Sequence, residues 1–102
     1  MPRIRIAETA GDDLEDIWEY IAENNPEAAR KLIKEITGKF KLLRDHPQIG
    51  REENRLLANM RSFPVGNYVI LYQPVEKGVE ILRILHAARD IEKILGRFID
   101  SA

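Results

Sequence analysis

The chain of 102 residues carries 16 Lys and Arg against 17 Asp and Glu, a formal net charge of −1, and it has two His and no Cys. This length, an apolar fraction of 44% and a charged fraction of 32% are typical of one folded domain, here residues 1–102, and argue against disorder and low complexity. The absence of Cys excludes disulfides and thiolate metal sites, no apolar run reaches the roughly 18–20 residues of a membrane span, and a charged N-terminus without an export signal makes the cytoplasm the expected location.

Polar and apolar residues alternate from Arg3 to Ala7, which is the period of a half-buried strand. A helix is expected next, with Thr9 as its N-cap and Asp12 in the capping-box position. The apolar stripe of this helix, at i, i+3, i+4 and i+7, consists of Leu14, Ile17, Trp18 and Ile21. Trp18 is therefore expected to be buried, either against a second helix or under a partner.

A second helix is predicted to open at Asn25 and Pro26, which are favoured N-cap and first-turn residues. It should run to about His46, where Pro47 blocks continuation. The residues expected on its apolar face are Ala29, Leu32, Ile33, Ile36, Phe40 and Leu43. Because the connection between the two helices is short, they should form an antiparallel hairpin.

Beyond residue 53 the pattern changes from a helical to a strand period. Strands are predicted at 60–65, 68–72 and 79–86, with turns at 66–67 and 76–78, and a short helix at 87–98. The order β-α-α-β-β-β-α predicts an α+β fold, with a small, mainly antiparallel twisted sheet and the helical hairpin packed on one face. The last two strands are largely apolar on both sides, so the second face of the sheet should also be covered, by the last helix, by a partner, or by both.

Charge is distributed unevenly along the first two predicted helices. Eight acids and no base occur from Glu8 to Glu27, and six bases with one acid occur from Arg30 to Arg44. The simplest explanation is a pair of neighbouring helices with complementary solvent faces, and the alternative is a surface that attracts a charged partner.

The sequence shows no metal-ligand spacing, glycine-rich phosphate loop, serine-nucleophile elbow or dinucleotide fingerprint, so no metal site and no cofactor are expected. Arginines do occur among the apolar residues of the predicted strands, and such a residue needs a carboxylate, a backbone carbonyl or a phosphate as partner. Arg61 and Arg83 therefore either bind internally, for instance to Asp90, or form a cationic ledge for a phosphate-bearing or acidic partner.

Strict alternation along residues 79–86 would put Arg83 and Leu85 on the face of Ile81, and His86 on the opposite face. His86 is then either a strand-end residue with a hydrogen-bonded imidazole or a proton donor or acceptor near neutral pH.

Several segments together resemble the toxins of the RelE/ParE superfamily of bacterial type II toxin–antitoxin systems, and most of all its ParE branch, the plasmid stabilisation proteins. These segments are residues 13–22 of the first helix, Pro26 with Ala29, residues 46–51 (written Pro-x-x-Gly-Arg in the family), residues 61–72 and residues 81–90. Each is weak alone, but in this order they span nearly the whole chain.

The resemblance implies a small toxin that a cognate antitoxin neutralises by wrapping an acidic, partly helical segment around the helical hairpin and the sheet. In the ParE branch the implied target is DNA gyrase, and in the RelE branch the implied activity is cleavage of mRNA in the ribosomal A site. A hetero-oligomer with the antitoxin is implied, and a toxin dimer within that complex is left open.

A ribonuclease needs a base, an acid and cations around a 2′-hydroxyl and its scissile phosphate, and Arg61, Arg83 and His86 would be the catalytic residues of that branch. Against it, residues 52–55 lack the expected lysine cluster, no Tyr follows Arg83, and a net charge of −1 suits a ribosome poorly. Non-enzymatic inhibition of gyrase is therefore the preferred function, with a ribonuclease or an inactive antitoxin-binding module as alternatives.

The predicted site residues follow from this reading. Target binding is assigned to Arg61, Arg83 and Arg89. The antitoxin is expected to contact apolar and aromatic residues, namely Leu14, Trp18, Ile21, Tyr68 and Tyr72. For the two tyrosines, which share one strand face, packing in the core is the alternative.

Overall fold

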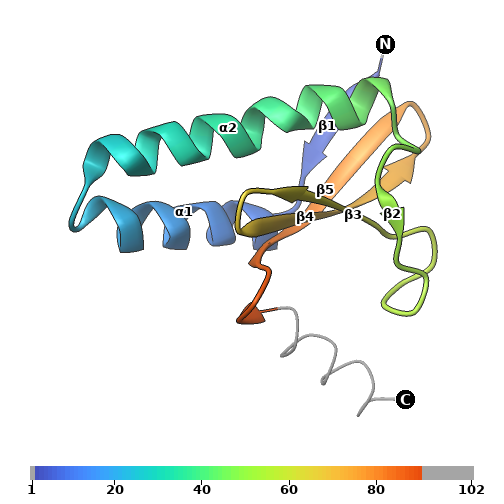
Figure 1. Ribbon diagram of the computed structural model, residues 1–102. Coiled ribbons are helices and arrows are strands. Elements are labelled where there is room, and N and C mark those ends of the chain that lie inside the picture. The colour runs from blue at the N-terminus through green and yellow to red at the C-terminus, as the bar shows by residue number, and fades with distance from the viewer. Residues whose placement is uncertain (1, 91–102) are drawn as a thin grey trace.

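The computed structural model describes residues 2–90, which form two helices on one face of a sheet (Figure 1). In chain order the elements are β1 (Arg3–Ile6), α1 (Glu8–Ala22), α2 (Pro26–Asp45), β2 (Arg51–Glu52), β3 (Arg61–Val65), β4 (Tyr68–Val75) and β5 (Gly78–His86). The strand order is β1-β5-β4-β3-β2, with β1 parallel to β5 and all other neighbours antiparallel. The predicted α+β fold is confirmed, and the β1–β5 pair makes the sheet mixed rather than wholly antiparallel.

Helix α2 begins at the residue predicted from the sequence, whereas α1 does not. The Asn25 side chain caps α2 by accepting a hydrogen bond of 3.0 Å from the Ala28 N–H, as expected. The N-cap of α1 is Ala7, without a side-chain bond, so the prediction of Thr9 as N-cap is wrong. The reason is tertiary, because the Thr9 hydroxyl donates instead to the Leu82 carbonyl oxygen of β5 at 2.8 Å.

One core fills the space between the helical hairpin and the sheet. Its fully buried members include Ile36 and Leu43 of α2 with Ile70 and Tyr72 of β4, and it extends to residues of α1 and β5. Trp18 is 38% exposed, so the expectation that it packs inside against the second helix is wrong for the chain alone.

β5 contains a bulge that sequence periodicity did not reveal. Arg83 and Ile81 pair with successive residues of β4, so Leu82 is an extra residue. As a result Ile81 and Ile84 both belong to the core under the helices, whereas Leu85 belongs to a cluster on the other side of the sheet. The expected placement of Leu85 on the face of Ile81 is wrong, because an inserted residue reverses the alternation that follows it.

The second face of the sheet carries a smaller apolar cluster. Its buried members are Met60, Leu71 and Leu85, and Leu56 packs against them. Leu56 and Met60 come from the segment between β2 and β3, so this segment covers part of the face. Of the predicted helix at 87–98, residues 87–89 form a turn and the part from 91 onward lies outside the described residues. Within residues 2–90, no helix is long and apolar enough to cross a bilayer.

Candidate functional site

An open groove of about 720 Å³ lies between α1 and the C-terminal half of β5. Its lining residues are Asp13, Asp16, Ile17, Tyr20, Tyr68, Arg83, Ile84, Leu85, Arg89 and Asp90. β1 pairs with β5 only as far as Ile81, so the groove exposes the stretch of β5 that β1 does not accompany. We call it the α1–β5 groove.

Along this groove, side chains form hydrogen bonds with the main-chain N–H and carbonyl groups at the edge of β5. Asp13 accepts a hydrogen bond of 2.9 Å from the Ile84 N–H, and Asp90 accepts one of 2.8 Å from the His86 N–H. Together with the Thr9 hydroxyl on the Leu82 carbonyl oxygen, these contacts take the place of the hydrogen bonds that a longer β1 would make.

Arg83 forms a bidentate ion pair with Asp13. Its Nε donates to Asp13 Oδ2 at 2.7 Å and its second terminal nitrogen to Oδ1 at 3.0 Å. The hydrogen bond to Asp13 raises the pKa of Arg83 above its usual value, although partial burial acts in the opposite direction. Internal pairing, one of the two expectations for this arginine, is what the structure shows, but the acid is Asp13 rather than Asp90.

The other predicted residues near the groove are His86 and Arg89. The His86 ring meets the Tyr68 ring edge to face, with centroids 5.3 Å apart, and its Nδ1 accepts a hydrogen bond of 3.2 Å from the Ala88 N–H. The exposed Arg89 guanidinium lies 5.6 Å from the centre of the Tyr20 ring, a cation–π contact at the rim of the groove. Arg83 and Arg89 thus both line the groove, and His86 packs against its lining residue Tyr68.

Arg61 lies elsewhere, under the loop of residues 47–50 that joins α2 to β2. One terminal nitrogen donates to the carbonyl oxygens of Gln48 at 3.1 Å and Gly50 at 2.7 Å, and the other donates to Gln48 Oε1 at 2.6 Å and, at 3.4 Å, to Glu52. It lines a separate hollow of about 250 Å³ with Gln48 and Glu52. In the sheet, β4 lies between β3, which carries Arg61, and β5, which forms one wall of the groove. Arg61 therefore forms no common ledge with Arg83 and Arg89.

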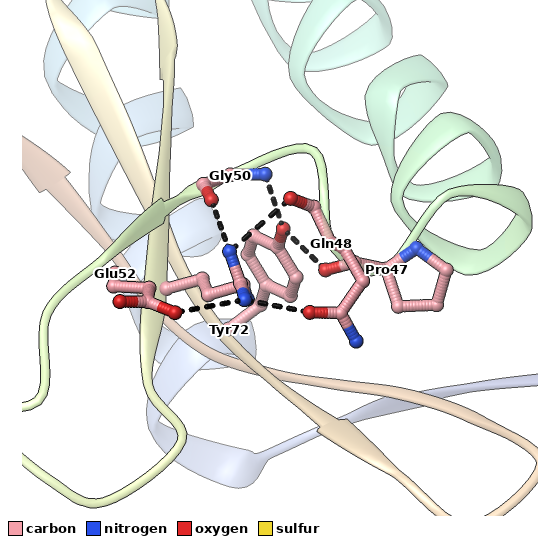
Figure 2. Close-up of polar contacts among 6 residues, drawn as sticks. Pro47, Gln48, Gly50, Glu52 and Tyr72 are labelled. Atoms are coloured by element: carbon pink, nitrogen blue, oxygen red, sulfur yellow. Dashed lines mark hydrogen bonds and ion pairs between the residues drawn. The ribbon is translucent and has the colours of Figure 1, made fainter.

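Tyr72 holds the same 47–50 loop from below. Its hydroxyl accepts a hydrogen bond of 2.8 Å from the Gly50 N–H and donates one of 2.9 Å to the Pro47 carbonyl oxygen; Figure 2 shows the hydroxyl between these two residues. Burial raises the pKa of Tyr72 above 10.0, while the Gly50 N–H and the nearby Arg61 lower it. This tyrosine is fully buried in the chain alone, so core packing, the alternative, is what the structure shows, and contact of Tyr72 with an antitoxin stays a prediction.

We expect Tyr72→Phe to lower the free energy of unfolding by about 1–2 kcal/mol, because the variant leaves the Gly50 N–H and Pro47 carbonyl unpaired. The raised pKa also predicts a pH effect. The stabilisation by the neutral hydroxyl is fully present below pH 10, the ordinary tyrosine value, and is lost as the pH rises through the higher pKa of the folded state. Urea unfolding from pH 8 to pH 11 should therefore show the two proteins converging at alkaline pH, and a constant difference would contradict this assignment.

The remaining antitoxin-binding predictions involve residues of different exposure. Leu14 and Ile21 pack against the core and are partly buried, and Tyr68 is 9% exposed. Trp18 and Tyr20 of α1 are the well-exposed ones, at 38% and 66%. Contact of the four predicted residues Leu14, Trp18, Ile21 and Tyr68 with an antitoxin stays a prediction.

Several residues of these two regions were not anticipated from the sequence. Asp13 looked like one of many helix acids, and nothing in the sequence marks its contact with Arg83, 70 positions away. Gly50 did carry a signal, since it stands in the Pro-x-x-Gly-Arg segment.

None of the four ion pairs among the described residues joins α1 to α2, so the two charge blocks are not neutralised by direct contacts between the helices. Residues 2–90 contain no group of three or more His, Asp or Glu that could hold a metal ion.

Comparison with known proteins gives concordant matches. A family model described as "ParE toxin of type II toxin-antitoxin system, parDE" matches residues 4–91. The chain is 31% identical over 97 residues to Toxin ParE1 of Caulobacter vibrioides, covering 94% of this chain and 100% of that protein. It is 29% identical over 98 residues to Toxin ParE3 of the same organism, covering 95% and 98%. A solved structure titled "Chromosomal ParDE TA system from P. aeruginosa" shares the fold, with a TM-score of 0.69 and 23% identity over 84% of this chain and 96% of that one.

Proposed function

The chain belongs to the ParE toxin family of type II toxin–antitoxin systems, and from this premise we propose that it inhibits DNA gyrase in the cytoplasm without itself catalysing a reaction. The same premise supports a cognate antitoxin as its partner. Inhibition then depends on a surface that binds gyrase rather than on a set of reacting groups.

The observation that carries the non-enzymatic reading is the internal engagement of both strand arginines. A ribonuclease would need free cations beside a proton donor and acceptor at one phosphate. Here the Arg83 guanidinium is bound to Asp13, Arg61 is bound to the 47–50 loop, and the two lie in separate hollows. His86 is on the same strand as Arg83, but its Nδ1 already accepts a main-chain hydrogen bond.

We further propose that the antitoxin covers the α1–β5 groove and the adjoining face of α1. Ile17, Tyr68 and Ile84 give the groove apolar walls, Tyr20 lines it with an exposed ring, and Trp18 exposes aromatic surface on the same helix. Arg89 at the rim supplies a positive charge for an acidic antitoxin segment. Exposed aromatic side chains of this kind are typical of protein interfaces.

Purified gyrase and supercoiled plasmid test the first proposal directly. With the wild-type chain present, linear plasmid should accumulate after the gyrase is denatured and digested, because a poison traps the enzyme on cleaved DNA. Prior addition of the antitoxin should abolish the linear product.

A cell-free translation extract tests the alternative, that the chain is a ribonuclease. The proposal predicts that mRNA in the extract stays intact when the chain is added. Cleavage of mRNA that disappears in His86→Ala or Arg83→Ala, without trapped plasmid, would establish the ribonuclease instead. A chain that binds antitoxin and does neither would be an inactive binding module.

A further inference from the structure

The 47–50 loop exposes an isoleucine on a main chain that the protein interior holds in place. Ile49 is 49% exposed, and its own N–H donates to the His46 carbonyl oxygen at 3.0 Å in a tight turn. Its two neighbours along the chain, Gln48 and Gly50, are the residues that Arg61 and Tyr72 bind. The isoleucine thus projects from the centre of the held segment.

Five hydrogen bonds from two side chains define the conformation of this loop. Tyr72 contributes two, to Pro47 and Gly50, and Arg61 contributes three, to Gln48 and Gly50. Tyr72 is fully buried and the Arg61 side chain is only 16% exposed, so both anchors are themselves fixed by packing. The loop therefore has its conformation before any partner arrives, which reduces the entropy lost on binding.

The need of Arg61 and Tyr72 for hydrogen-bond partners explains the fold of the main chain, but it does not explain the side chain at position 49. Turn positions usually carry Gly, Pro, Asn, Asp or Ser, and a half-exposed isoleucine adds little to the stability of the chain alone. Single exposed apolar residues are common on protein surfaces. What distinguishes Ile49 is that its backbone is fixed by buried side chains, as in binding loops presented by a rigid scaffold.

We propose that Ile49 on the 47–50 loop is an anchor through which this toxin contacts its target protein, at a surface separate from the α1–β5 groove. This inference rests on the proposed function only in that the toxin acts by binding a target. The loop leads into β2 at one edge of the sheet, whereas the groove lies at β5 and α1 toward the other edge (Figure 1). An antitoxin seated in the groove would leave the loop for a second partner.

The chemistry of the loop favours a protein as that partner. An isoleucine side chain offers no donor to a phosphate, and it is recognised by an apolar pocket. The next two exposed residues, Arg51 and Glu52, carry opposite charges, so the loop has no net positive charge for a nucleic-acid backbone. The structure therefore supports a target surface with an apolar pocket flanked by polar groups.

A matched pair of variants tests the proposal in the full-length chain. Ile49→Thr and Ile6→Thr replace the same residue type at nearly equal exposure, 49% and 48%, and both keep a β-branched side chain. Each is expressed without antitoxin from an inducible promoter, and the protein level needed to halve the growth rate is measured. We expect Ile49→Thr to need at least tenfold more protein than the wild type, Ile49→Val to act like the wild type, and Ile6→Thr to remain fully inhibitory.

Binding of the purified antitoxin to each variant completes the experiment. Unchanged antitoxin affinity of Ile49→Thr, together with its lost growth inhibition, supports a separate target surface. Full toxicity of Ile49→Thr would overturn the proposal, and so would an equal loss of antitoxin affinity, which would place the loop in the antitoxin interface. A wild-type chain that does not inhibit growth would overturn it as well. If gyrase is not trapped on DNA but growth inhibition still depends on Ile49, then the gyrase proposal fails and this one stands.

Discussion

Gly50→Ala is expected to destabilise the fold by about 3 kcal/mol. A β-carbon at this position would lie 2.6 Å from Cε1 of Tyr72 and 2.9 Å from the Ser62 carbonyl oxygen, and it would also meet the Tyr72 hydroxyl. Neither neighbour can move freely, because Tyr72 is fully buried and the Ser62 oxygen belongs to the backbone of β3. Overpacking of this kind costs about 1–3 kcal/mol, and displacement of the loop would add the lost hydrogen bonds of the Tyr72 hydroxyl.

Gly38→Ala is the matched control for this substitution. Gly38 lies inside α2, and a β-carbon there would meet nothing within 4 Å. Its replacement should stabilise the protein by roughly 0.5–1 kcal/mol through helix propensity alone. Urea unfolding followed by circular dichroism should give shifts of opposite sign for the two variants. A neutral Gly50→Ala would mean that the loop is not seated on Tyr72 as described.

Asp13→Ala should lower the free energy of unfolding by about 2–3 kcal/mol. The substitution removes both hydrogen bonds to Arg83 and also leaves the Ile84 N–H of β5 without its acceptor. The Asp13 side chain is only 13% exposed, so water compensates little at that end of the pair, whereas the Arg83 side chain is 36% exposed and can be partly rehydrated. The expected loss is therefore smaller than the roughly 3–5 kcal/mol observed when a fully buried ion pair is broken.

Asp12→Ala separates these contacts from the general effect of removing an acid from α1. Asp12 is exposed, and the same change there should shift stability by no more than about 0.5 kcal/mol. Asp13→Asn keeps an oxygen for the Ile84 N–H but loses the charge, so it should fall between the two. Equal stability of Asp12→Ala and Asp13→Ala would show that the carboxylate does not hold the edge of β5.

These two positions stabilise different parts of the two proposed binding surfaces. Gly50 sets the conformation of the loop that presents Ile49, and Asp13 sets the wall of the α1–β5 groove. If the antitoxin and the target bind at separate surfaces, variants at the two positions should also differ in which partner they lose. The affinities for both partners are best measured at a temperature well below that of unfolding, so that a loss of stability is not mistaken for a loss of binding.

Local chemistry in the sequence by itself determined the helical hairpin, one of the strand hairpins and the family resemblance of this protein. The 3.6-residue period and the Asn25 cap gave the helical hairpin, and the two-residue turn at 66–67, where Gly66 has a φ of 58°, gave the β3–β4 hairpin. The family resemblance was likewise a property of short segments in order. Each of these signals lies within a few residues along the chain, which is why the sequence alone reveals it.

Tertiary structure alone decided which partners the polar residues have in distant parts of the chain. Periodicity could not show the extra residue Leu82, because a bulge is defined only by the strand beside it. It could not show that Thr9 serves β5 rather than its own helix, nor that Asp13 rather than Asp90 binds Arg83. An arginine in a strand sequence indicates that a hydrogen-bond acceptor must lie nearby. Which acceptor it binds depends on which distant segments the packed core brings within about 3 Å.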